Sequence, residues 1–298
     1  MRPWMLPSLN RRRLLEFGSV GLAASLGAVR GAGAEELRDP GPSGIGGYVL
    51  GVFPYLPPSS LDRRFAPIVE ALRQRIGQPV HLRTKSDLEA FAVEVARGTY
   101  DITFLNPFEY VEAAGAGYLP LVRVDEPLSM VLLVPADSPI TDLRGLGGHT
   151  LALPQRSSAV SRLARLALFE EGLQPGVDLQ VQFYQSKSSC LQALAIGNVA
   201  ACGLPRFALP QLGLSDTRSY KVVYERKLPV GLTFAVHNRL SEADRDGIRA
   251  ALLGLSDTDT GRQILKEASW PRLVLAHDQD FDEIRRLEAR MSTLAMRR

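Results

Sequence analysis

Short apolar segments alternate with amphipathic segments along most of this chain of 298 residues, and this alternation restricts the possible folds more than any other feature. A short apolar run bounded by turn residues is typical of a buried strand, whereas apolar residues spaced three and four apart indicate one face of a helix. Strands that alternate with helices build a layered α/β fold with a mainly parallel sheet. We expect strands at residues 48–53, 80–84, 102–105, 130–134, 150–153, 179–183, 199–203, 220–224 and 232–236, and helices at 60–76, 87–97, 107–114, 158–171, 188–196, 242–254, 259–267 and 280–296.

The order of these elements suggests two lobes. The rhythm of strand and helix in the first half returns in the second half, although the two halves are not alike in sequence. We expect the chain to cross between lobes near residues 123–128 and to return near 224–231. One lobe would then contain residues 48–127 and 231–298, and the other residues 128–230. Residues 35–47, which are rich in glycine and proline, are typical of a flexible lead-in.

The first 34 residues have the three ordered parts of an export signal. Arg11-Arg12-Arg13 forms the basic part, residues 17–29 form an apolar core, and Ala32-Gly33-Ala34 predicts cleavage after Ala34. The core is shorter than the roughly 18 residues that a membrane-spanning helix needs. Residues 10–15 resemble the twin-arginine export motif, although Glu16 stands where that motif prefers lysine; an ordinary secretory signal is the alternative. Either route predicts a periplasmic protein.

Composition argues against nucleic acid as a partner. Residues 1–34 contain five arginines and one glutamate, so their removal changes the formal charge from +3 to −1. A nearly neutral mature chain lacks the basic surface that nucleic-acid binding requires. Hydrophobic residues at 45% and charged residues at 22% are the values of a soluble globular protein.

Cysteine and histidine are sparse. Cys190 and Cys202 are the only cysteines, so the chain has no disulfide framework. We favour two small buried thiols, and a single bridge between them is the alternative. The four histidines, at positions 81, 149, 237 and 277, show no spacing typical of metal ligands. We therefore expect neither a metal site nor a cofactor.

Several segments match one family when they are taken in order and at their intervals. They are Val52-Phe53-Pro54-Tyr55, residues 98–110 (GTYDITFLNPFEY), residues 134–145 (VPADSPITDLRG), Ser157-Ser158 and Ser186-Lys187-Ser188-Ser189. Together they resemble the phosphate/phosphite/phosphonate-binding proteins of ABC importers, a branch of the type II periplasmic binding proteins. The resemblance covers nearly the whole mature chain. It implies two lobes, each a mainly parallel sheet flanked by helices, that are joined by two crossover segments and close around a small oxyanion.

The expected ligand contacts lie at or near helix starts. The first backbone N–H groups of a helix have no partner within the helix, and the helix dipole is positive there, so such ends bind oxyanions. Serine and asparagine at these positions also cap helices, and capping is the alternative interpretation. The predicted ligand-binding residues are Tyr55, Asn106, Tyr110, Ser157, Ser158, Ser186, Lys187, Ser188 and Ser189.

Lys187, Tyr55 and Asp101 differ in the roles that we expect for them. Lys187 stands where the resembling proteins have histidine, and an ordinary lysine stays charged near neutral pH, so we expect anion binding that depends little on pH. A solvated lysine is the alternative. Tyr55 follows a strand and can cover the ligand and donate its hydroxyl; packing on Pro57 at the rim is the alternative. We interpret Asp101 as structural, because a carboxylate facing an anion would repel it.

Departures from the family pattern bear on the ligand. Leu128 replaces a frequent tyrosine, Ala200 replaces the usual aspartate, and Leu232 is apolar where an acid can occur. A ligand ammonium without a carboxylate partner in a closed cleft is costly, so we expect no aminoalkylphosphonate. Arg206 would favour a more negative ligand if it faced the cleft, and a surface position is the alternative. The same departures leave room for a ligand without phosphorus.

Three functions fit this fold. The first is a monomeric binding protein that captures a small oxyanion, namely phosphate, phosphite or a phosphonate lacking an amine, and delivers it to the membrane permease of an ABC transporter. The second is a ligand-sensing module that signals to a membrane sensor kinase. The third is an enzyme, which we do not expect, because the chain has no Gly-x-Ser-x-Gly elbow, no His-Glu-x-x-His motif and no glycine-rich phosphate loop.

Overall fold

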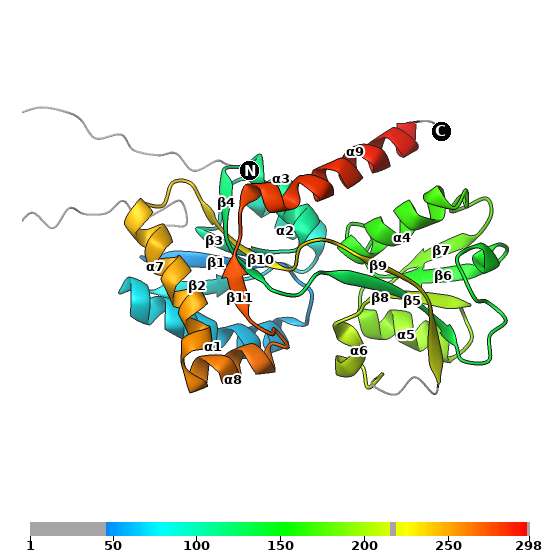
Figure 1. The fold of residues 1–298 in the computed structure, drawn as a ribbon, viewed down its shortest axis with the longest axis horizontal. Helices are drawn as coiled ribbons and strands as arrows, with labels where there is room; N and C mark the ends of the chain where they lie inside the picture. Colours follow the sequence, from blue (N-terminus) through cyan, green and yellow to red (C-terminus); the bar gives the residue numbers. More distant parts are fainter. Residues whose placement is uncertain (1–45, 215–218, 297–298) are drawn as a thin grey trace, which may run out of the picture. The chain divides into compact units, whose positions relative to one another are not determined.

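Two β-sheets with flanking helices organise the part of the chain that a computed structural model describes, residues 46–214 and 219–296 (Figure 1). The predicted export signal and almost all of the predicted lead-in lie outside the described residues. Within the described residues, no helix is both long enough and apolar enough to span a membrane.

The first sheet has six strands in the order β11-β4-β10-β3-β1-β2. β1 lies parallel to β2 and β3, whereas β10 lies antiparallel to β3 and β4, and β11 antiparallel to β4. Its strands are β1 (Tyr48–Val52), β2 (Val80–Arg83), β3 (Ile102–Leu105), β4 (Tyr118–Val124), β10 (Thr233–His237) and β11 (Leu273–Leu275). The helices that accompany these strands along the chain are α1 (Pro58–Ile76), α2 (Leu88–Ala96), α3 (Pro107–Ala114), α7 (Glu242–Leu253), α8 (Asp259–Glu267) and α9 (Asp282–Met296).

The second sheet has five strands in the order β7-β6-β8-β5-β9. β6 lies parallel to β7 and β8, and β5 lies antiparallel to β8 and β9. Its strands are β5 (Ser129–Pro135), β6 (Thr150–Leu153), β7 (Gln180–Phe183), β8 (Ala201–Pro205) and β9 (Tyr220–Lys227), and its helices are α4 (Ala159–Glu170), α5 (Lys187–Ala195) and α6 (Ala208–Gln211). Figure 1 shows α4 on one side of this sheet and α5 and α6 on the other.

The predicted α/β class is confirmed, and so is the presence of two sheets. The parallel pairs that the sequence indicates are present, but antiparallel strands join them, so both sheets are mixed rather than mainly parallel. β4 and β11 were not predicted. The exact lobe boundaries stay a prediction, although the first sheet takes its strands from residues 48–124 and 233–275 and the second from residues 129–227.

Aromatic residues form the centre of the core beside the first sheet. The Phe104 ring lies 4.5 Å from Phe234, 5.0 Å from Trp270 and 5.3 Å from Phe65, measured between ring centroids. Phe65 comes from α1, whose buried residues Leu61, Phe65, Ile68 and Leu72 recur at the three- and four-residue spacing of one helix face. The core therefore fixes the end of β3, from which α3 begins.

Asp101 is structural, as we interpret it from the sequence. Its Oδ2 atom accepts a hydrogen bond from the backbone N–H of Val49 at 2.8 Å, and its Oδ1 atom accepts one from Nη2 of Arg239 at 2.8 Å. Its side chain is almost wholly buried. A buried carboxylate that is paired and hydrogen-bonded in this way fixes the start of β3 against β1.

Helix α9 contacts helices that accompany both sheets. It packs against α3, and it forms two ion pairs with α4. Glu288 of α9 lies 3.0 Å from Arg162, and Arg290 lies 2.9 Å from Glu170. Figure 1 shows this helix in red, running from beside α3 toward α4.

Candidate functional site

A large cavity lies where strands of both sheets lead into helices. It has a volume of about 500 Å³, within the range of roughly 300–1,000 Å³ that is typical of small-molecule pockets. Ligands of open α/β sheets bind at this kind of position, beyond the carboxyl ends of the strands. The cavity is lined by residues before or at the starts of α1, α2, α3, α4, α5 and α6, by Gln211 and Leu212 at the end of α6, and by Leu128 and Leu232.

Two serines cap the helices that begin at this cavity. Ser158 is the N-cap of α4 and accepts a hydrogen bond from the backbone N–H of Ser161 at 3.2 Å. Ser186 is the N-cap of α5 and accepts one from the backbone N–H of Ser189 at 3.0 Å. The capping interpretation is thus correct for both serines, and both also line the cavity.

The caps leave the earliest N–H groups of these helices without a partner in the helix. In α4 these are the N–H groups of Ala159 and Val160, and in α5 those of Lys187 and Ser188. All four residues line the cavity. The positive ends of two helix dipoles therefore face the same space.

Lys187 is the cation of this cavity that has no acidic partner among the described residues. Its ammonium donates a hydrogen bond to the backbone carbonyl of Tyr55 at 2.9 Å and lies 5.5 Å from the Tyr55 ring and 5.3 Å from the Phe207 ring. Burial, assisted by the positive charge of Arg64, lowers its pKa to about 8. This lowered pKa contradicts the premise of the expected weak pH dependence, which is the pKa of a lysine in water. Lys85, the other lysine of the lining, is paired with Glu94 at 3.4 Å.

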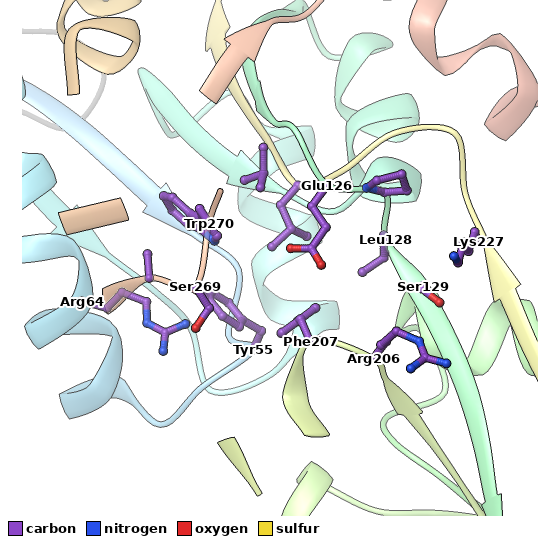
Figure 2. A pocket seen from close by; sticks show the side chains of 14 residues that line it. Tyr55, Arg64, Glu126, Leu128, Ser129, Arg206, Phe207, Lys227, Ser269 and Trp270 are labelled. Atoms are coloured by element: carbon purple, nitrogen blue, oxygen red, sulfur yellow. The ribbon is translucent and has the colours of Figure 1, made fainter. Parts of the chain in front are cut away.

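Tyr55 lies between two cavities. Its ring stacks on Phe53, with 4.7 Å between centroids, and it lines both the large cavity and a smaller one of about 150 Å³. Burial raises the pKa of its hydroxyl to about 12, and nearby Arg64 opposes this shift. The hydroxyl forms no hydrogen bond of good geometry with a described residue, although Arg64 is close enough to affect its pKa. Figure 2 shows Arg64 and Tyr55 in the smaller cavity, with Trp270 nearby.

Asn106 serves as the N-cap of α3. Its Oδ1 atom accepts hydrogen bonds from the backbone N–H groups of Phe108 and Glu109, at 3.0 and 3.2 Å, and Glu109 accepts one from the backbone N–H of Asn106. This is a complete capping box. Asn106 lines the large cavity, and its Nδ2 donors are not used by the cap.

Three of the predicted residues do not line the cavity. The hydroxyl of Tyr110 donates to Asp278 at 2.7 Å, and its ring packs on Phe281. The hydroxyl of Ser157 donates to Glu89 at 2.8 Å, and the Ser189 hydroxyl lies 2.8 Å from that of Ser186. We therefore exclude these three from the candidate site, which retains Tyr55, Asn106, Ser158, Ser186, Lys187 and Ser188.

Sequence reasoning missed other residues of the lining. Gln155 accepts a hydrogen bond from the backbone N–H of Leu88 at 3.2 Å, and Gln185 precedes the cap of α5. Both follow a strand and come just before a helix, which is the signal that could have identified them. Leu212 lies after α6, a four-residue helix without a sequence signature of its own.

The cavity lacks acidic groups. No aspartate or glutamate occurs among the described residues that line it, and Leu128 and Leu232 do line it. Arg206 lines the smaller cavity instead, as Figure 2 shows, and its Nε donates to Glu225 at 2.7 Å. Its charge is thus compensated by Glu225 and not directed at the large cavity. Ala200 lines neither cavity.

Solved structures with the same fold come from several bacteria. A binding protein component of an ABC phosphonate transporter from Pseudomonas aeruginosa aligns over 83% of this chain and 87% of its own, with 16% identity and a TM-score of 0.74. PhnD1 from Prochlorococcus marinus, solved with methylphosphonate, aligns over 82% and 98%, with 16% identity and a TM-score of 0.72. A Xanthomonas citri protein bound to chloride aligns over 84% and 99%, with 18% identity and a TM-score of 0.71.

Two sequence comparisons were informative to different degrees. A search of curated proteins finds no match to this chain, whereas a family model does match. The model of the phosphonate periplasmic substrate-binding proteins of ABC transporters matches residues 50–281, which is most of the chain. The matched segment includes every residue of the candidate site. The chain therefore belongs to the family of periplasmic substrate-binding proteins of phosphonate ABC transporters.

Proposed function

We propose that the protein captures phosphate, phosphite or a phosphonate without an amine in the cavity of about 500 Å³. One observation carries this proposal: the starts of α4 and α5 and the ammonium of Lys187 face one space that has no carboxylate among its described lining residues. Converging helix dipoles and a cation favour an anion, and the missing carboxylate disfavours a ligand ammonium.

The oxygen atoms of such a ligand have defined partners. The N–H groups of Ala159, Val160, Lys187 and Ser188 supply backbone donors, and the Lys187 ammonium supplies a charge-assisted one. Asn106 adds its Nδ2 group, which the capping box does not use. Tyr55 covers the ligand through its ring, beside Lys187.

Delivery to an ABC permease is the role we assign to the occupied protein. Type II binding proteins close two lobes around a ligand, and closure creates the surface that a membrane partner distinguishes. Contacts between segments that accompany the two sheets support closure here, because Lys187 reaches Tyr55 across the cavity and Ser157 reaches Glu89 outside it. We also propose export by a signal in residues 1–34. The mass of the protein isolated from the periplasm should correspond to cleavage after Ala34, and Arg11→Lys with Arg12→Lys should block export by the twin-arginine route.

Calorimetry and thermal shift of the mature protein test the ligand. We expect phosphate, phosphite or methylphosphonate to raise the unfolding midpoint, because a ligand that binds only the folded state stabilises it. Aminoethylphosphonate should give no shift. Ser158→Ala combined with Lys187→Ala should abolish the shift, whereas Ser189→Ala, a serine on α5 outside the cavity, should keep it. A shift that survives the double substitution would refute the site, and no shift with any oxyanion would refute the ligand class.

A further inference from the structure

The large cavity is bigger than an inorganic oxyanion needs. A water molecule takes up roughly 30 Å³, so an ion of five heavy atoms needs at most about 150 Å³ at one such volume per heavy atom. The cavity measures about 500 Å³. Most of its lining surface is apolar, and Leu128, Phe207, Leu212 and Leu232 contribute to that surface.

These apolar side chains lie close to the expected charge of the ligand. The Phe207 ring is 5.3 Å from the Lys187 ammonium, so a ligand that contacts Lys187 also comes near Phe207. Leu128 and Leu232 line both cavities and are almost completely buried. A substituent on the oxyanion would therefore meet apolar surface and no carboxylate.

We propose that the ligand is an oxyanion with an apolar alkyl or aryl substituent larger than methyl, held against Leu128, Phe207, Leu212 and Leu232. This inference rests on the proposed function, because it requires that the oxyanion occupies the helix starts. Burial of apolar surface then adds to the affinity that the charged head group provides.

A series of phosphonates with one head group tests the substituent. Calorimetry with methyl-, ethyl-, butyl- and phenylphosphonate should show the dissociation constant falling about fourfold per buried methylene, the effect expected for transfer of one CH₂ group out of water. Equal or weaker binding of butyl- and phenylphosphonate relative to methylphosphonate would overturn this inference and leave the proposed function intact. Absence of binding by every member would overturn both.

A matched pair of variants locates the substituent. Leu212→Ala should weaken binding of butyl- and phenylphosphonate several-fold and leave methylphosphonate unchanged. Leu191→Ala is the control, because Leu191 packs partly buried in the same small apolar cluster as Leu212 but does not line the cavity. Equal effects of the two substitutions on all ligands would overturn the placement.

The two cysteines lie close together in the second sheet and the helix beside it. Cys190, in α5, and Cys202, in β8, are buried thiols, as we expect from the sequence, but their Sγ atoms lie only 2.9 Å apart. A disulfide bond measures about 2.05 Å, so less than about 1 Å of movement would join them. The pair links the helix whose start carries Lys187 to the strand that leads to Phe207.

The structure assigns Cys190 and Cys202 as partners of a disulfide in the exported protein. An S–S bond forms between them, and a disulfide-bearing oxidant of the periplasm accepts both electrons and both protons as it becomes a dithiol. Burial raises the pKa of the Cys202 thiol, so the exchange proceeds from a chain in which α5 and β8 have separated, during folding or local opening.

Alkylation with mass analysis tests the bond in the protein isolated from the periplasm. Under denaturing conditions, iodoacetamide should add nothing before reduction and two groups after reduction. Cys190→Ala, the control, should accept one group without reductant. Addition of two groups to the unreduced protein would overturn the assignment.

Discussion

Anion binding should weaken as the pH rises through about 8, because Lys187 loses its charge there. Burial and the charge of Arg64 lower the pKa of Lys187 to about 8, whereas a lysine in water titrates at about 10.4. A bound anion favours the ammonium form and raises this pKa again. Affinity is therefore greatest below the pKa of the unoccupied protein and is lost above it.

The expected size of the effect follows from this difference in pKa. If the ammonium form carries the tight binding, the apparent dissociation constant grows as 1 + 10^(pH − 8) and rises about tenfold between pH 7 and pH 9. At pH 8 about half of the unoccupied molecules lack the Lys187 proton, so binding should take up about half a proton per ligand.

Titration calorimetry at pH 7, 8 and 9 measures both quantities, provided that buffers with different ionisation enthalpies are compared at one ionic strength. Lys187→Arg is the control, because a guanidinium stays charged throughout this range. The ratio of wild type to Lys187→Arg removes the ionisation of the ligand itself. Parallel pH profiles for the two proteins, or no proton uptake at pH 8, would refute the role of Lys187.

Three further predictions concern other buried or cavity-lining groups. Burial raises the pKa of Glu109 to about 8. The free energy of unfolding of the wild type, measured with urea, should therefore fall by about 3 kcal/mol from pH 5 to pH 8. Glu109→Gln, which keeps an acceptor for the backbone N–H of Asn106, should not show this fall. Arg239→Met should lower the free energy of unfolding by about 3–5 kcal/mol, because it leaves Asp101 buried and unpaired. Arg97→Met, at an exposed ion pair, is the control, and an equal loss of stability in both variants would contradict this prediction. Leu232→Glu should create calorimetric binding of aminoethylphosphonate, and continued absence of binding would show that Leu232 does not face the ligand.

The sequence predicts elements well where their signals are local. The apolar face of α1 and the proline at the first position of α3 identify both helices. β4 escapes prediction because Pro120 interrupts its apolar pattern, and β11 has only three residues. The antiparallel pairing of β10 with β3 joins residues more than a hundred positions apart, and no local pattern encodes that direction.

The residues of the candidate site are likewise predictable only where their signal is local. Ser158 and Ser186 are recognisable because a serine before a helix is a local signal. Tyr110 and Ser157 do not line the large cavity, and their hydroxyl groups bond to distant residues, Asp278 and Glu89, which no local pattern indicates. The pKa of Lys187 depends on burial beside Tyr55, which is 132 positions away, and therefore cannot be read from the lysine and its neighbours.

Helix α9 offers a way to observe movement around the large cavity without altering the residues that line it. The helix packs on α3 and pairs with α4 through Arg162 and Glu170, so separation of α3 from α4 changes its surroundings. The Arg290–Glu170 pair, whose arginine is mostly exposed, is weak and screened by salt, so it breaks readily when the helices separate. A dye attached at the exposed Ser292 would therefore change its emission with lobe movement and turn the protein into an optical sensor for its own ligand.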